Sequence, residues 1–311
     1  MDFAGNGFTV EPILRDYVDS VESPLPTTPP IIEGLLRERG RLVIGGEPGV
    51  GKSILALQLC WSFATGVPFV GLPVAGPIRT LYVQTELEPD QVEERWKHQA
   101  PCYPNLERGW LAHYQAIPWI WHDQVTQLAD VILKGEFEAL VLDPFSAICE
   151  IDDENDSAKM NRMLYQELDG LKRYCNLKAL IIVHHFRKPQ PQFQSAPSLA
   201  SLRGAGLGQW CDAFIGVLGS REHNDATLLF DKLRAYAPLD PLMVTRDDST
   251  LTYSDASWQI ATVNEALADE EWHTLVDLQR DLGIGRERLN AIVRDAQNIE
   301  TGQRGRVKRV V

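Results

Sequence analysis

The sequence predicts an α/β fold, in which a central, mostly parallel β-sheet is covered by helices and is followed by a small helical domain near the C-terminus. Segments with strand-like and helix-like patterns alternate from about residue 31 to 253. Strand-like segments such as 179–183 (Ala-Leu-Ile-Ile-Val) are apolar throughout. Strands of this kind are typical of parallel sheets with helices on both faces.

The order of the expected elements follows from these patterns. We expect strands at residues 41–45, 79–84, 110–115, 138–143, 178–184, 213–218, 226–233 and 241–246. We expect helices at residues 52–65, 89–100, 123–134 and 157–175. The strands after about residue 213 have no long helices between them, which indicates antiparallel additions to the sheet.

A phosphate-binding loop occupies residues 46–53. These residues read Gly-Glu-Pro-Gly-Val-Gly-Lys-Ser and match the pattern G-x-x-x-x-G-K-[ST]. A strand-like segment precedes the loop and a helix-like segment follows it. Glycines let backbone N–H groups surround a phosphate, and the N-terminus of a helix favours anions. The motif therefore predicts a site for ATP and Mg²⁺ that is formed by Gly46, Glu47, Pro48, Gly49, Val50, Gly51, Lys52, Ser53 and Ile54.

Hydrolysis of a nucleotide needs further groups, which the sequence places at the ends of strands. An apolar strand ends at Asp143, as expected of a carboxylate that holds the water shell of Mg²⁺. Together with Ser53, whose hydroxyl is expected to ligate Mg²⁺, it forms the predicted metal site. Glu86 follows another strand and is the candidate that activates water. Glu88 is its rival, and a helix-capping acid is the alternative interpretation of Glu86.

Two histidines, His184 and His185, stand at the end of a further strand. Adjacent side chains of a strand point to opposite faces, so the pair is not expected to share one metal ion. We expect His185 to face the nucleotide and to sense its γ-phosphate. The alternative is a histidine that only lies in a loop.

Composition sets limits on the class of protein. No apolar run of 18 residues and no secretory signal is present, so we expect a cytoplasmic protein that does not cross a membrane. The five cysteines are scattered without a C-x-x-C pair, which argues against a zinc site or a disulfide scaffold. The net charge of −13 makes the surface as a whole repel nucleic acid, so any DNA contact must be local.

The charge is uneven, and this bears on the division into domains. Residues 276–311 hold eight Lys and Arg against five Asp and Glu. We expect an N-terminal extension with a Pro-rich linker (1–30), a main domain (31–253), a linker (254–270) and a small C-terminal domain (271–311). In the last domain we expect a first helix from Trp272, a Gly-rich turn, a second helix and a basic strand from residue 304. This order fits a winged helix-turn-helix, or a plain helical hairpin that packs on the main domain.

The order of these parts resembles the RecA-like branch of P-loop ATPases, and within it the DnaB-type and RepA-like hexameric helicases. The segment that ends at Glu86 (Leu-Tyr-Val-Gln-Thr-Glu) is similar to the strand that carries the family's catalytic glutamate. Residues 185–189 (His-Phe-Arg-Lys-Pro), 201–206 (Ser-Leu-Arg-Gly-Ala-Gly) and 231–234 (Asp-Lys-Leu-Arg) are similar to further family segments. The resemblance covers roughly residues 31–250. Arg234 is followed by Ala-Tyr-Ala-Pro, where the DnaB-type proteins have a Gly-containing stretch.

The resemblance implies roles for individual residues. Besides Lys52, Glu86 and His185, it implies that Lys232 and Arg234 act on the nucleotide of a neighbouring subunit. The alternative for Arg234 is an exposed strand arginine that only pairs with a surface acid. The contacts to single-stranded DNA are expected at Arg187, Lys188 and Arg203.

Two functions are consistent with the sequence. The first is a homo-oligomeric, hexameric ATPase that moves on single-stranded DNA and works with a replication partner protein, like the helicases of plasmids or phages. The second is a KaiC-like regulatory or loader ATPase that binds a protein partner and does not translocate. A small-molecule kinase is disfavoured, because the sequence has no lid-like cluster of arginines.

Overall fold

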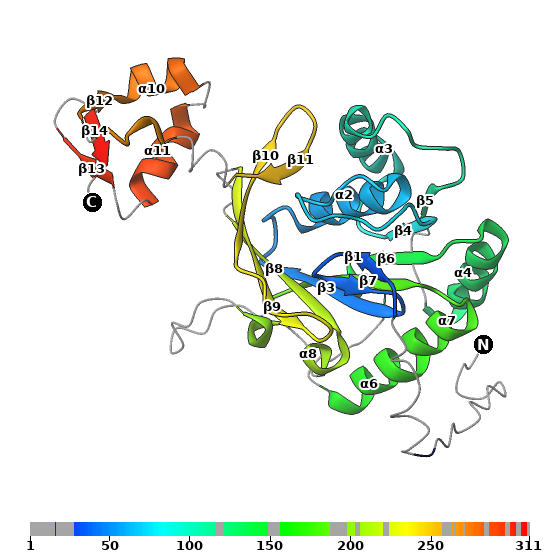
Figure 1. Ribbon diagram of the computed structural model, residues 1–311. Helices are drawn as coiled ribbons and strands as arrows, with labels where there is room; N and C mark the ends of the chain where they lie inside the picture. Colours follow the sequence, from blue (N-terminus) through cyan, green and yellow to red (C-terminus); the bar gives the residue numbers. More distant parts are fainter. Residues whose placement is uncertain are drawn as a thin grey trace. The chain divides into compact units, whose positions relative to one another are not determined.

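The computed structural model (Figure 1) describes part of the chain in detail. The described residues are 16, 28–115, 121–148, 156–186, 198–202, 206–219, 224–256, 263, 265–269, 271–282, 286–295, 299–302 and 306–309. The chain divides into two compact units. One contains Met1–Pro241 and Thr245–Ser254, and the other contains Leu242–Val244 and Asp255–Val311.

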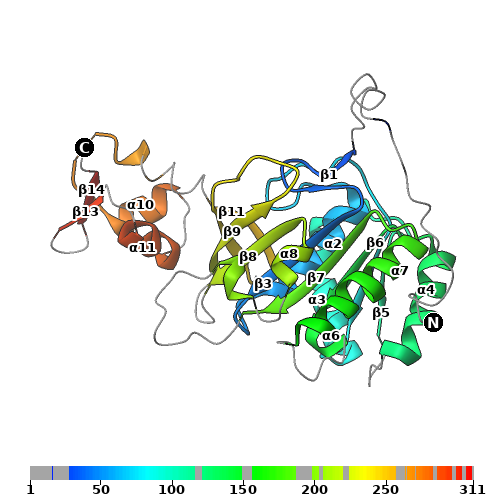
Figure 2. The ribbon, with the colours of Figure 1, turned by 90° about the horizontal axis from the view of Figure 1, so that it is seen from below.

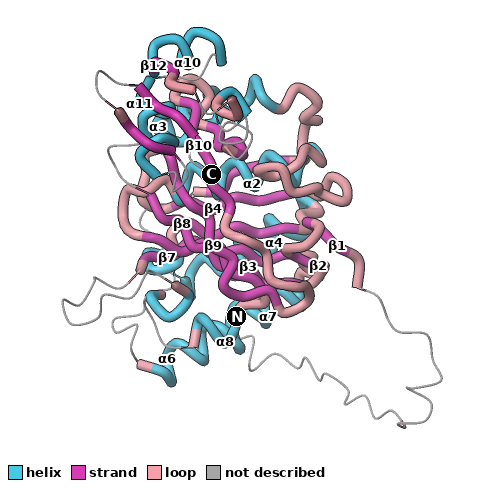
Figure 3. The backbone as a smooth tube through the Cα atoms, turned by 60° about the vertical axis from the view of Figure 1, so that its left-hand side comes forward, coloured by secondary structure: helices cyan, strands magenta, loops and turns pink. Residues whose placement is uncertain are grey.

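A nine-stranded sheet forms the centre of the first unit, in the order β11-β10-β9-β8-β3-β7-β6-β4-β5. Six neighbouring strands run parallel: β8 (Ala213–Gly219), β3 (Gly40–Gly46), β7 (Ala179–His185), β6 (Ala139–Asp143), β4 (Thr80–Gln84) and β5 (Leu111–Tyr114). β9 (Asp225–Leu233) runs antiparallel to β8, and β10 (Leu242–Asp247) and β11 (Thr252–Asp255) complete that side. A separate pair, β1 (Pro30–Ile32) and β2 (Leu36–Arg37), precedes β3. The strands lie side by side in Figure 3.

Helices cover both faces of this sheet (Figures 1 and 2). On one face lie α2 (Lys52–Thr65) and α3 (Pro89–Gln99), which continues into η1 (Ala100–Cys102). On the other lie α4 (Trp121–Gly135), α5 (Phe145–Ile148), α6 (Ser157–Asn161), η2 (Arg162–Leu168) and α7 (Asp169–Tyr174). The short η3 (Leu199–Ser201) and α8 (Leu207–Trp210) precede β8. Alternate residues of the parallel strands pack against each helical layer, which explains why these strands are apolar throughout.

Local signals in the sequence set the ends of the helices. α2 ends at Thr65 and is capped by Gly66, which has a left-handed backbone (φ 74°) and whose N–H donates to the carbonyl of Ser62. α3 begins at Pro89, and Glu88 and Gln91 cap its N-terminus reciprocally. The carboxylate of Asp156 accepts hydrogen bonds from the first N–H groups of α6.

The fold class predicted from the sequence is confirmed. Each of the eight predicted strands agrees with an observed one, from β3 to β10, within one residue at either end. The helix predicted at 157–175 is present, although its middle turns, η2, are wound as a π-helix. One prediction is wrong: β8 is a parallel neighbour of β3, and the antiparallel part of the sheet begins only with β9. Strand β11 was not predicted.

The second unit has an apolar core of its own. It contains β12 (His273–Thr274), α10 (Leu275–Leu282), α11 (Arg286–Asp295), β13 (Ile299–Thr301) and β14 (Arg306–Arg309), and its sheet has the order β12-β14-β13. The core residues are Val263, Leu267, Leu278, Leu289, Ile292, Val293 and Val307. The first helix begins three residues later than Trp272, because β12 pairs with β14 and the hydroxyl of Thr274 accepts the N–H of Asp277. Among the described residues, no helix has both the length and the apolar character that a membrane span requires.

Deletion of residues 263–311 tests whether this core is independent. We expect the truncated protein to stay soluble, with the melting temperature of the sheet unit unchanged, because the deletion removes the whole apolar core of the second unit. Differential scanning calorimetry of both proteins measures this. If residues 263–311 instead dock on the sheet unit, the deletion exposes an apolar seat, and a lower melting temperature or aggregation follows.

Candidate functional site

The phosphate-binding loop joins β3 to α2 at the carboxyl edge of the parallel strands. Gly49 and Gly51 have left-handed backbones, with φ of 84° and 91°. A Cβ atom on Gly46 would lie 2.8 Å from the carbonyl oxygen of Val217 on the neighbouring strand. No side chain caps the N-terminus of α2, so the N–H groups of its first turn point toward the loop. The loop therefore has the backbone shape that surrounds a phosphate.

Lys52 lies over this loop. Its side chain is almost fully buried, with 4% of its surface exposed, and its Nζ donates a hydrogen bond to the carbonyl oxygen of Glu47 at 2.7 Å. The ammonium group is therefore held beside the loop backbone, where the phosphates of a nucleotide bind in this motif.

The two predicted metal residues lie together. Asp143, at the end of β6, is buried, and the hydroxyls of Tyr82 and Ser53 both form hydrogen bonds with its carboxylate. The distance from Tyr82 Oη to Asp143 Oδ2 is 2.7 Å. Burial raises the pKa of Asp143, while these two hydrogen bonds and the charge of Lys52 oppose the shift. A buried carboxylate beside a serine hydroxyl is a donor set of oxygens, which suits Mg²⁺.

The structure separates the two candidate glutamates. Glu86 is an exposed residue whose carboxyl is nevertheless partly desolvated: burial and the charge of Asp143 raise its pKa, and the charge of Lys52 lowers it. Glu86 thus interacts with both charged groups of the site. Glu88 caps the N-terminus of α3. The helix-capping role that was the alternative for Glu86 thus belongs to Glu88. Of the two glutamates, Glu86 is the one whose pKa is shifted by the charges of Asp143 and Lys52.

His185 ends β7, directly beside the loop strand. It pairs with Gly46 of β3 in the backbone register. His184 is fully buried and packs edge-on against Phe145, with ring centroids 5.4 Å apart. Because side chains alternate along a strand, His185 points to the opposite face, on which α2 lies. Among the described residues, no group of three or more His, Cys, Asp or Glu is arranged to bind a metal ion.

Lys232 and Arg234 do not join this constellation. β9 is antiparallel to β8, so Leu228 is level with Val217 and Gly46, whereas Lys232 pairs with Phe214 farther down the sheet. The pair therefore lies toward the opposite edge of the sheet from its own phosphate loop. The residues expected to contact DNA, Arg187, Lys188 and Arg203, lie outside the described residues.

Three residues that shape the site are not predicted by the sequence. The hydroxyl of Tyr82 positions Asp143. Tyr82 pairs with Val141, two residues before Asp143, so the alternation of side chains along β4 and β6 places both on one face. This alternation is the only signal for the contact in the sequence. The side-chain amide of Gln58 bonds to the backbone N–H and C=O of Tyr253 in β11, both at 2.7 Å. A Cβ atom on Gly51 would lie 2.0 Å from Tyr253 Oη, so this ring packs directly on the phosphate loop. No local pattern predicts a contact across about two hundred residues.

The contact between Tyr82 and Asp143 leads to a prediction for the variant Tyr82→Phe. Loss of the hydroxyl removes one of two hydroxyl hydrogen bonds that orient the carboxylate, so we expect the Mg²⁺ concentration for half-maximal turnover to rise roughly 10-fold. Mg²⁺ titrations of turnover and of fluorescent ADP binding measure it. Tyr114→Phe, on the edge strand β5, is the matched control. An unchanged Mg²⁺ requirement would mean that the Tyr82 ring only packs.

Comparisons with known proteins agree with this geometry. A KaiC-like protein, PH0186, from the hyperthermophilic archaeon Pyrococcus horikoshii OT3 has a similar structure, with a TM-score of 0.51 and 15% sequence identity over 72% of this chain and 93% of that one. The ATPase domain of the protein G40P matches with a TM-score of 0.55 and 12% identity, over 76% of this chain and 95% of that one. Identities this low show a shared RecA-like fold alone. No curated protein sequence matches the chain significantly.

A family model adds sequence-level support. The model described as AAA domain matches residues 10–191, which include the phosphate loop, Glu86, Asp143 and His185. The match spans more than half of the 311 residues. The chain therefore belongs to the AAA domain family, and its core is a RecA-like P-loop ATPase.

Proposed function

We propose that the protein is an oligomeric, ATP-hydrolysing motor that acts on single-stranded DNA, as DnaB-type and RepA-like helicases do. The observation that carries the proposal is the position of Lys232 and Arg234. They lie toward the sheet edge opposite their own phosphate loop, so they can serve nucleotide chemistry only on a second copy of the chain. A hexameric ring satisfies this requirement.

The groups around the phosphate loop divide the chemical work. The loop backbone from Gly46 to Ser53 binds the phosphates, and Lys52 offsets negative charge that develops on them. Ser53 and Asp143 would hold Mg²⁺, which neutralises phosphate charge when bound. Glu86 orients and activates the attacking water, and a carboxyl with a raised pKa is a better base than an ordinary glutamate. His185 senses the γ-phosphate from the adjacent strand.

We assign DNA binding to basic residues on particular segments, because the chain as a whole is acidic. Arg187, Lys188 and Arg203 follow the sensor strand, at positions that would line the pore of a ring. The second unit, with its order of strand, two helices and a two-stranded hairpin, would act as a winged helix that contacts DNA or a replication partner protein. A motor of this kind works in the cytoplasm.

A KaiC-like regulatory ATPase is the second candidate. The net charge of −13 favours it, and the TM-score with a KaiC-like protein, 0.51, is only slightly lower than the value of 0.55 with the ATPase domain of G40P. Turnover measured with and without single-stranded DNA, on a sample of measured mass, separates the two. Stimulation by DNA in a ring-sized species supports the motor, and no stimulation supports the regulatory ATPase.

Glu86→Gln isolates the water-activating step. We expect it to abolish nearly all turnover and to leave ATP binding intact, because the amide keeps the shape of the side chain but cannot accept a proton. Lys52→Ala is expected to abolish hydrolysis as well. Turnover and fluorescent-nucleotide affinity are measured together. Glu88→Gln, in the helix cap, is the control, and near wild-type turnover in Glu86→Gln would refute this assignment.

Arg234→Ala tests the shared site. We expect turnover to fall on the order of 10³-fold, as for arginine fingers, with ATP affinity little changed. Mixing Arg234→Ala with Lys52→Ala protein should restore activity, because some interfaces then pair an intact phosphate loop with an intact arginine. A mixture as inactive as its components, in oligomers shown to exchange subunits, would contradict a site shared between subunits.

A further inference from the structure

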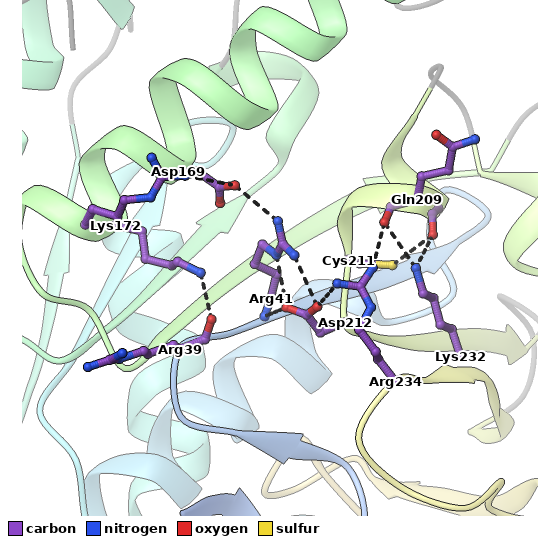
Figure 4. Close-up of polar contacts among 11 residues, drawn as sticks. Arg39, Arg41, Asp169, Lys172, Gln209, Cys211, Asp212, Lys232 and Arg234 are labelled. Atoms are coloured by element: carbon purple, nitrogen blue, oxygen red, sulfur yellow. Dashed lines mark hydrogen bonds and ion pairs between the residues drawn. The ribbon is translucent and has the colours of Figure 1, made fainter. Parts of the chain in front are cut away.

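A cluster of charged residues surrounds Arg234 at the edge of the sheet away from the phosphate loop (Figure 4). Asp212 precedes β8 directly, Arg41 lies near the start of β3, and Arg234 follows the end of β9. The backbone N–H of Arg234 also donates to the carbonyl of Asp212 at 2.8 Å. Segments far apart in sequence therefore meet at one carboxylate.

Asp212 is fixed from the side of the protein core. Its Oδ2 accepts hydrogen bonds from the backbone N–H and from Nε of Arg41, both at 3.0 Å, and its Oδ1 accepts from Nη2 at 3.2 Å. Arg41 is in turn tied to Asp169 of α7, with Nη1 and Oδ2 3.1 Å apart. Arg41 thus anchors Asp212 to the central strand and to a helix of one layer.

Arg234 is the outermost member of this chain of contacts. Its Nη1 lies 2.5 Å from Asp212 Oδ1, and its Nη2 donates to the carbonyl oxygen of Gln209 at 3.0 Å. The exposed fraction of the side chain rises from 15% for Arg41 to 22% for Asp212 and 50% for Arg234. A guanidinium group has five N–H donors, so two acceptors orient it and leave further donors for another anion.

Lys232 is held by the same short segment. Its Nζ donates to the carbonyl oxygens of Gly208 and Gln209, at 2.7 and 3.2 Å, near the C-terminal end of α8. The cations of the cluster outnumber its carboxylates. The cations are Arg41, Lys172, Arg173, Lys232 and Arg234, and the carboxylates are Asp169 and Asp212. In a chain with a net charge of −13, this excess of positive charge suits a polyanion such as a triphosphate.

We propose that Asp212 is a positioning residue that, held by Arg41, fixes the guanidinium of Arg234 in the orientation in which it reaches the nucleotide of a neighbouring copy. This inference rests on the shared site proposed above. An arginine that is already oriented loses little rotamer entropy when it meets the phosphate, and its charge needs no reorganisation. The opposite role, in which Asp212 sequesters Arg234 and inhibits turnover, predicts the opposite effect of mutation.

Asp212→Asn in the full-length protein tests the proposal. The amide keeps the size of the side chain but loses the charge and one acceptor oxygen. We expect turnover to fall on the order of 10²-fold, as for a misplaced catalytic group, with ATP affinity unchanged. Asp248→Asn is the matched control, because Asp248 also pairs with an arginine, Arg246, at 3.2 Å but lies outside the cluster. Turnover at or above the wild-type rate in Asp212→Asn would overturn the proposal.

Mixed oligomers distinguish positioning from general damage. Asp212→Asn has an intact phosphate loop, and Lys52→Ala has an intact Asp212 and Arg234, so mixing the two should restore turnover. Failure of this mixture, while Arg234→Ala with Lys52→Ala recovers, would overturn the role of Asp212 and leave the shared site standing. Failure of both mixtures would overturn the shared site and this inference together.

A milder variant keeps the test valid if Asp212→Asn does not fold. Arg41→Lys retains a positive charge but cannot bridge Asp212 and Asp169 with a planar fork. We expect it to lower turnover by a smaller factor, with ATP affinity unchanged and with recovery in the mixture with Lys52→Ala. A lowered melting temperature with full turnover would show that the cluster only stabilises the fold, and would overturn the proposal.

Discussion

The parallel register of β3 with its neighbours is the constraint on which the site depends. The carboxyl ends of parallel strands lie along one side of the sheet. Residues that follow separate strands therefore meet there although they are far apart in the sequence. Gly46, Asp143 and His185 each end a strand of this set, and Glu86 follows another. A register shift of one residue would turn their side chains to the other face. Close packing of the buried side chains between the two helical layers opposes such a shift.

Strand direction has the opposite consequence for β9. Because this strand returns antiparallel, its last residues are carried away from the phosphate loop, toward the edge where β3 begins. Lys232 and Arg234 are therefore close to the loop neither in sequence nor in space. The same topology that brings the phosphate loop, Asp143 and His185 together at one end of the parallel strands places the cationic cluster toward the other end, as the proposed head-to-tail oligomer requires.

Much of the fold was predictable, because long apolar strands and a phosphate loop leave few alternatives. The boundaries of β6 and α2 follow from local patterns, and Asp143 is recognisable because a carboxylate ends an apolar strand. The direction of β8 was not predictable, since direction depends on how the chain crosses over. The position of Glu88 as the cap of α3 also needed the structure. Tyr82 and Tyr253 act through hydroxyls and ring contacts with distant segments, for which an isolated tyrosine gives no signal.

Electrostatics explain why an exposed arginine in this chain needs a carboxylate of its own. In a chain with a net charge of −13, a long cationic side chain that is not anchored would form ion pairs with other acidic residues. Repulsion between Lys232 and Arg234 would also separate these two side chains. Asp212 and the carbonyl oxygens at the end of α8 offset that repulsion and hold both cations on one side. Arg41 offsets the negative charge of Asp212 from the side of the protein core. The cluster therefore keeps an excess of positive charge. The same arrangement of charges therefore stabilises the cluster and leaves it able to bind an anion.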